Sequence, residues 1–252
     1  MTATPRQRPA VSLLHRDPPM TPMRFFGGRP VGFAVAVAAL IVLTILAAFQ
    51  DGKVLLVVDE PIMRWVVAHR TDTWTDVFSF ASHFGDNIVV FSLAIALAAW
   101  TWPRCRFLAG ALLLAAAIRP GLEFLLKGAV ARPRPDLSPL GIFHGPSYPS
   151  GHPLAAASLW GLLPAVVAMH THNKVVWWIS VGFSGLIIAG VAAARVYKGA
   201  HHPTDVVASL AFAGLYLALV QGFFDRFHGA RDCRHPQHSV QTELVDEQTS
   251  LP

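Results

Sequence analysis

Long apolar runs, separated by short polar segments, occupy most of the chain. A helix rises about 1.5 Å per residue, so a run of roughly 20 apolar residues crosses the ~30 Å hydrocarbon core of a membrane. Six runs approach this length, and we predict that they are membrane-spanning helices: 31–49, 87–102, 107–127, 153–169, 175–194 and 206–224. The expected fold class is therefore all-α, a six-transmembrane-helix bundle formed by one domain over residues 30–224.

The segments outside these runs differ in character. Residues 1–29 and 225–252 are polar and rich in charge, which favours disordered tails. Residues 54–67 mix apolar side chains with charges, which favours a helix lying along the membrane interface. Six spans place both termini on one side. Both tails and the short turns at 103–106 and 170–174 carry basic residues, so the positive-inside rule assigns that side to the cytoplasm.

The charge content agrees with a membrane protein. Only 14% of residues are charged, whereas soluble chains average about 25%, and 53% are hydrophobic. The net charge of +5 and the pI of about 9.7 would also suit a nucleic-acid-binding protein. The basic residues, however, flank apolar runs as membrane-flanking residues do, so we expect membrane lipids and no nucleic acid as partners.

Three polar islands interrupt this pattern at residues 127–135, 148–152 and 195–205. In the predicted topology all three lie at span ends on the non-cytoplasmic side. They bring together the cations Lys127, Arg134 and Arg195, and phosphate oxygens suit such a set because the guanidinium fork matches them. Ser150 and Gly151 stand at a predicted helix start, where free backbone N–H groups offer a further anion site.

Two histidines and a carboxylate add reactivity to this predicted anion site. His152 and His201 can act as nucleophile and as general acid/base near neutral pH. Asp205 follows His201 by four residues, so at a helix start its carboxylate can reach the imidazole and fix its tautomer. Each residue alone is weak evidence for a functional site, because basic residues at span ends usually extend toward the lipid headgroups. Together they predict phosphoryl transfer that needs no metal and no cofactor.

The spacings of the islands resemble a known family signature. Lys-x6-Arg-Pro at 127–135, Pro-Ser-Gly-His at 149–152 and Arg-x5-His-x3-Asp at 195–205 are similar to the three motifs of the type 2 phosphatidic acid phosphatase superfamily. The six predicted spans fit its integral membrane branch. The third motif of that family commonly begins with Ser-Arg, and Ala194 stands at the serine position here, which removes a possible hydroxyl contact.

The resemblance implies a role for each matching residue. His201 would attack phosphorus, His152 would protonate the leaving oxygen and then activate water, and Asp205 would orient His201. The remaining matching residues would hold the phosphoryl oxygens and stabilise the transition state: Lys127, Arg134, Arg195, Ser150 and Gly151.

Three charges in the third apolar run form a further pattern. Arg119, Glu123 and Lys127 are spaced by four residues, so they share one helical face. Charges inside a membrane are usually paired. We expect Glu123 to bridge Arg119 and Lys127 and to position Lys127, the alternative being a purely structural pair. Arg132, within the first motif, is a possible further support.

The function implied by the resemblance is hydrolysis of a lipid phosphate monoester or diphosphate through a phosphohistidine. An isoprenoid diphosphate is the first expected substrate, followed by phosphatidic acid and phosphatidylglycerol phosphate. A lipid phosphotransferase of the same fold, or a non-catalytic membrane transporter or scaffold, are the competing readings. The expected location is the plasma (inner) membrane with the active site on the non-cytoplasmic side, and the oligomeric state stays open.

Overall fold

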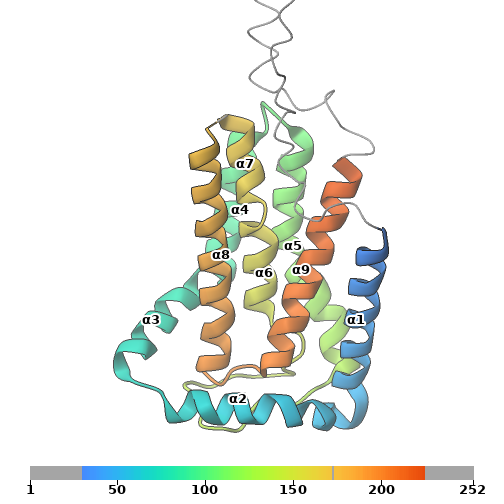
Figure 1. Cartoon of the computed structure of the whole chain (residues 1–252), viewed down its shortest axis with the longest axis vertical. Helices are drawn as coiled ribbons and strands as arrows, with labels where there is room; N and C mark the ends of the chain where they lie inside the picture. The colour runs from blue at the N-terminus through green and yellow to red at the C-terminus, as the bar shows by residue number, and fades with distance from the viewer. Residues whose placement is uncertain (1–29, 172, 225–252) are drawn as a thin grey trace, which may run out of the picture.

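The computed structural model describes residues 30–171 and 173–224, and every regular element in those ranges is a helix. The predicted tails, 1–29 and 225–252, lie outside the described residues. Figure 1 shows the arrangement of the elements: α1 (Pro30–Ala48), η1 (Phe49–Leu55), α2 (Leu56–Ala68), α3 (Asp72–His83), α4 (Asn87–Thr101), α5 (Arg106–Val130), α6 (Gly151–Trp160), α7 (Leu163–His170), α8 (Lys174–Tyr197) and α9 (Pro203–Phe223).

Four described segments are long and apolar enough to cross a membrane by themselves: α5, Gly151–His170 (α6 with α7), α8 and α9. They confirm four of the six predicted spans. The other two pass only as bent pairs. Val37–Ala48 joins Lys53–Ala68 at an angle of 109°, and Asp72–His83 joins Asn87–Thr101 at 45°. The described chain therefore holds between four and six candidate spans, and the predicted six is the upper limit.

The helix predicted along the membrane interface is α2, which lies across one end of the bundle (Figure 1). Its outward face is apolar, with Val57 79% and Trp65 63% exposed, while Asp59 on the same helix is fully buried. This inverted pattern means that α2 turns a charge toward the bundle and apolar side chains outward. Such a helix suits the boundary between lipid and water.

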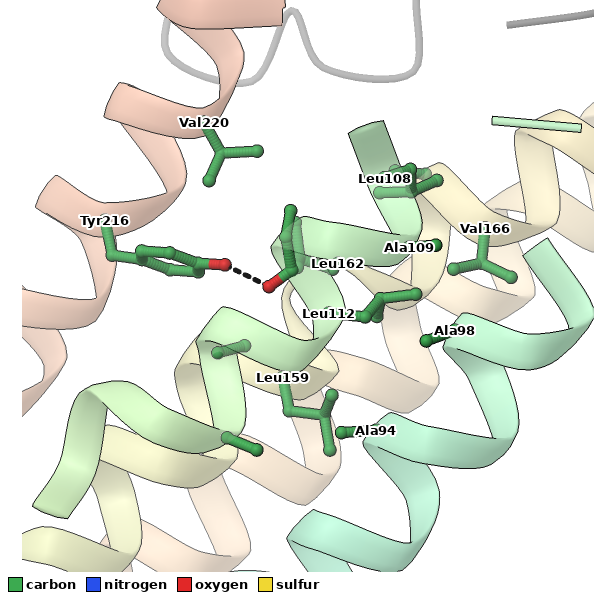
Figure 2. Packing of buried hydrophobic residues seen from close by; sticks show 14 of the residues in the cluster. Ala94, Ala98, Leu108, Ala109, Leu112, Leu159, Leu162, Val166, Tyr216 and Val220 are labelled. Carbon is green, nitrogen blue, oxygen red and sulfur yellow. Dashed lines mark hydrogen bonds between the residues drawn. The ribbon is translucent and has the colours of Figure 1, made fainter. Parts of the chain in front are cut away.

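Small side chains hold the helices close together in the part of the bundle remote from α2. Figure 2 shows Ala94 and Ala98 of α4 beside Leu159 of α6 and Leu112 of α5, all buried. Alanine at such contacts lets helix backbones approach closely, which is how membrane helices gain packing energy without a hydrophobic driving force. Tyr216 of α9 adds a hydrogen bond from its hydroxyl to the backbone carbonyl of α5 (Figure 2).

The residues of the three polar islands gather at the other end of the bundle, where α2 lies. There α5 and α8 end, α6 and α9 begin, and the loop 131–150 runs alongside α2 (Figure 1). This confirms the prediction that the three polar islands meet at one end of the bundle. Local sequence explains the helix boundaries: Ala131 takes a left-handed conformation at φ 49° and Pro133 follows, so α5 cannot continue.

Candidate active site

His201 is held at the end of the turn between α8 and α9. Gly199 allows this turn because its φ is +67°, a conformation that side chains disfavour. The Nδ1 atom of His201 lies 2.7 Å from the backbone carbonyl oxygen of Ser147, and Nε2 lies 3.3 Å from Arg134 Nη1. A carbonyl only accepts and a guanidinium only donates, so Nδ1 carries the proton and Nε2 carries the lone pair.

The surroundings of His201 favour its neutral form. Burial lowers the pKa of His201 well below its usual value, and the nearby cations Arg134 and Arg195 lower it further. His201 as a whole is only 3% exposed. At neutral pH the Nε2 lone pair is therefore available as a nucleophile rather than occupied by a proton.

The predicted role of Asp205 in fixing the tautomer of His201 needs a correction. Its Oδ2 lies 3.9 Å from His201 Nδ1, close enough for electrostatic attraction but too far for a hydrogen bond. Instead, the carboxylate accepts from Arg132 Nη1 at 2.6 Å and from the backbone N–H of His202 at 3.0 Å, which caps α9. The Ser147 carbonyl accepts the hydrogen bond that fixes the His201 tautomer. This partner belongs to the backbone, so a motif of side chains does not predict it.

Arg134 and Arg195 approach the reactive histidine from two elements. Arg134 is tied down by the loop, donating to the carbonyl oxygens of His144, Gly145 and Ala200. Arg195 is 6% exposed, and its Nη1 donates to Ser82 Oγ at 3.2 Å. The Phe143 ring lies 5.8 Å from the Arg134 guanidinium and 5.4 Å from that of Arg195, near enough to stabilise both cations.

Several buried polar atoms at this site have unmet hydrogen-bonding capacity. Arg195 Nε and Ser150 Oγ are both buried without a partner within the protein. Buried polar groups are normally satisfied, so groups of this kind in one place indicate a ligand that accepts hydrogen bonds. Over the described ranges, no group of three or more His, Cys, Asp or Glu side chains lies close enough to hold a metal ion. The donors fit the oxygens of a phosphoryl group.

The expected bridge by Glu123 is confirmed. Its Oε1 lies 3.1 Å from Lys127 Nζ and 3.5 Å from Arg119 Nε. This ion cluster lies against the start of α6, because a Cβ atom on Gly151 would come within 2.1 Å of Glu123 Oε1 and 2.6 Å of Arg119 Nε. Glycine therefore lets the cluster reach the predicted anion site. Whether Glu123 positions Lys127 for substrate stays a prediction.

His152 is the second residue of α6, and the sequence did not predict its carboxylate partner. His152 Nε2 lies 2.9 Å from Asp86 Oδ1, and the second Asp86 oxygen lies 2.8 Å from His83 Nδ1. Asp86 sits in the corner between α3 and α4, far from the three motifs in sequence. The only signal was a carboxylate directly before the second apolar run.

Arg132 lies behind the site rather than in it. The guanidinium is fully buried between two fully buried carboxylates, with Nη2 2.7 Å from Asp59 Oδ2 and Nη1 2.6 Å from Asp205 Oδ1. Thr204 completes the cluster by donating to Asp59 from its backbone N–H and its hydroxyl. Through this cluster α2 is fixed to the start of α9, the helix that begins two residues after His201. Arg132 thus supports Asp205.

The comparisons with known proteins agree on one family. Residues 107–228 match the PAP2 superfamily. Phosphatidylglycerophosphatase B from Bacillus subtilis (strain 168) is 29% identical over 188 residues, which cover 72% of this chain and 91% of that protein.

Two solved structures share the fold. The first transmembrane PAP2 type phosphatidylglycerolphosphate phosphatase from Bacillus subtilis aligns with a TM-score of 0.71 at 23% identity, covering 79% of this chain and 98% of that one. LpxE from Aquifex aeolicus aligns with a TM-score of 0.51 at 22% identity, covering 65% and 94%. Both likenesses extend beyond the matched residues 107–228. Residues 107–228, which hold all three polar islands, therefore form a PAP2 superfamily domain.

Proposed function

We propose that the chain is a membrane lipid phosphatase that removes the phosphate monoester of phosphatidylglycerol phosphate through a phosphohistidine on His201. The observation that carries this proposal is the His201 imidazole. Its Nε2 lone pair faces Arg134 at 3.3 Å, while Arg195 and Ser150 next to it hold buried donors without partners. A neutral histidine among cations is suited to attack a phosphorus atom whose oxygens those cations bind.

The choice of lipid rests on a relative. The chain covers 91% of Bacillus subtilis phosphatidylglycerophosphatase B, a protein named for this substrate. We therefore place phosphatidylglycerol phosphate before the isoprenoid diphosphate, which was the first expected substrate. Both lipids offer phosphoryl oxygens to the same cations, so the motifs could not separate them.

In the first chemical step, His201 Nε2 forms a bond to phosphorus and the bond from phosphorus to the leaving oxygen breaks. His152 supplies the proton that this oxygen takes up. The His201 ring becomes positively charged, because Nδ1 keeps its proton while Nε2 carries the phosphoryl group. The Ser147 carbonyl at 2.7 Å and the Asp205 carboxylate at 3.9 Å stabilise that charge.

In the second step, His152 takes a proton from water and the resulting hydroxyl oxygen bonds to phosphorus. The bond between phosphorus and His201 breaks, and both histidines return to their starting states. Arg134, Arg195, Lys127, the Ser150 hydroxyl and the backbone N–H of Gly151 hold the phosphoryl oxygens throughout. Donors aimed at developing charge of this kind are each worth roughly 10²–10³ in kcat.

The first experiment is phosphate release by the full chain purified in detergent, with EDTA present. Phosphatidylglycerol phosphate, phosphatidic acid and an isoprenoid diphosphate are offered in parallel, and the His201→Ala variant is the blank for contaminating phosphatases. We expect release that EDTA leaves unchanged, because fixed cations supply the positive charge, and we expect it to be fastest with phosphatidylglycerol phosphate.

Faster release from the isoprenoid diphosphate would replace the proposed substrate and keep the chemistry. Loss of release on adding EDTA, restored by Mg²⁺, would contradict the proposed set of phosphate ligands. No release from any of the three lipids by folded wild-type protein would overturn the lipid phosphatase proposal itself.

We also propose that the site faces the non-cytoplasmic side, with both termini in the cytoplasm, in a plasma (inner) membrane. The support is the basic side chains of Arg104, Arg106 and Lys174, which lie at the end of the bundle opposite to the loop 131–150. Ile142 in that loop is 85% exposed and is a suitable position for a probe. An Ile142→Cys variant should react with a membrane-impermeant maleimide in intact cells.

The wild-type chain, with its native Cys105 and Cys233, sets the labelling background for this experiment. Labelling of Ile142→Cys above background only after the cells are opened would place the site on the cytoplasmic side and refute the proposed orientation.

A further inference from the structure

The corner between α3 and α4 lies directly against the histidine that we assign as acid and base. A Cβ atom on Gly85 would come within 2.9 Å of His152 Cβ and 3.0 Å of its carbonyl oxygen. A larger residue at position 85 would therefore push the corner away from α6. This close approach brings the next residue, Asp86, to the imidazole.

The contact between Asp86 and His152 defines which ring nitrogen is free for chemistry. Asp86 Oδ1 lies 2.9 Å from Nε2, and an ionised carboxylate only accepts, so Nε2–H is the donor. Nδ1 is then the atom that can face a substrate. His83 Nδ1 lies 2.8 Å from the other Asp86 oxygen and holds the carboxylate from its solvent side, where His83 is 68% exposed.

The same corner also orders two cations near the phosphate-binding residues. Ser82 Oγ accepts from Arg195 at 3.2 Å. The Gly85 carbonyl and Asn87 Oδ1 accept from Arg119 at 3.2 and 2.7 Å. Residues 82–87 thus contact three side chains that surround the start of α6. They lie outside residues 107–228, the part of the chain that matches the family.

We propose that Asp86 is a positioning residue for His152, resting on the lipid phosphatase function proposed above. It keeps His152 in the tautomer and orientation that present Nδ1 to the leaving oxygen, and it stabilises the imidazolium that exists whenever His152 holds both protons. Asp86 itself stays ionised in both steps: the proton passes from His152 Nδ1 to the leaving oxygen, and later from water back to Nδ1. A carboxylate beside a catalytic histidine has this effect in other hydrolases.

The charged and titratable groups that face His152 come from four places in the fold. Asp86 with His83 approaches from the α3–α4 corner, Arg119 from α5, Arg195 from α8 and His201 from the turn between α8 and α9. Asp86 is the one carboxylate among these groups, so in this described part of the chain it alone offsets the two guanidiniums when His152 becomes protonated. Removing its charge should therefore impair proton transfer specifically.

The test compares two substrates that differ in their need for a proton. An alkyl leaving group, as in a lipid phosphate, requires protonation by His152, whereas the p-nitrophenolate released from p-nitrophenyl phosphate does not. Asp86→Asn should lower kcat/KM for the lipid about 100-fold, within the range that general acid catalysis contributes. It should lower kcat/KM for p-nitrophenyl phosphate less than about 3-fold, because its cleavage step needs no acid.

The matched control is Asp76→Asn, which removes an exposed carboxylate from α3 and should leave both values unchanged. Equal losses for the two substrates with Asp86→Asn would mean that Asp86 only maintains the fold, and no loss for either would mean that it has no role. Both results overturn the proposal.

A second measurement separates this inference from the proposed function. In protein with ¹⁵N-labelled histidine, at a pH where His152 is neutral, the His152 signals, assigned by their loss in His152→Gln, should report the Nε2–H tautomer, and Asp86→Asn should shift them. A wild-type Nδ1–H tautomer would refute the Asp86 contact whatever the turnover. Wild-type protein that releases no phosphate from lipids but shows the Nε2–H tautomer would overturn the lipid phosphatase proposal, and with it the catalytic role of Asp86.

Discussion

Replacing His201 with alanine should reduce kcat for lipid phosphate hydrolysis by at least about 10⁴-fold, as removal of a nucleophile does in other hydrolases. Nε2 of His201 is the only nitrogen of this ring that carries a lone pair, and Arg134 and Arg195 both lie close to the ring. Without it, the phosphoenzyme cannot form. Phosphate release at saturating lipid, followed over hours to reach the low residual rate, measures the loss.

The control for this prediction is His144→Ala in the same loop. The His144 side chain is exposed, and only its backbone carbonyl contacts Arg134, so this variant removes an imidazole without disturbing the hydrogen bond. It should keep kcat within about 2-fold, in line with surface substitutions elsewhere. A His201→Ala protein that keeps more than a tenth of wild-type kcat, while His144→Ala behaves as expected, would exclude His201 as the nucleophile.

The sequence was sufficient for the arrangement of the helices around the site. Four spans are long, apolar and bounded by polar turns, so the lengths of their apolar runs identify them. The alternation of spans then places the three polar islands at one end, because α5 and α8 finish where α6 and α9 start. The first two predicted spans are less regular, since α4 has only 15 residues and α1 leads into a helix lying across the bundle.

The sequence was not sufficient for the partners of the two histidines. Spacing correctly suggested that a carboxylate four residues after His201 would approach it, but the same carboxylate also caps α9 and neutralises Arg132. Those two contacts draw Asp205 away from hydrogen-bonding distance. His152 receives its carboxylate from Asp86, 66 residues earlier in the chain. Contacts of this kind depend on how the α3–α4 corner packs, which periodicity does not specify.

The buried charges behind the site are expected to have the largest effect on stability. Arg132→Met should destabilise the fold by about 3–5 kcal/mol, because it leaves Asp59 and Asp205 buried without their shared counterion. For a chain of this size such a loss corresponds to a lower Tm by on the order of 10 °C. Thermal unfolding of the detergent-solubilised variant, followed by circular dichroism at a fixed heating rate, measures the shift.

Arg64→Met on α2 is the matched control, since it removes an arginine whose partner, Glu60, lies four residues earlier on an exposed helical face. Exposed pairs of this type contribute less than about 1 kcal/mol, so the Tm should hardly change. The comparison isolates burial, because both variants exchange arginine for methionine beside a carboxylate. A small Tm shift for Arg132→Met, equal to that of Arg64→Met, would mean that the charge cluster does not fix α2 to the site. In that case His201 would depend on the loop carbonyl of Ser147 alone, and the buried Asp59 would need another explanation.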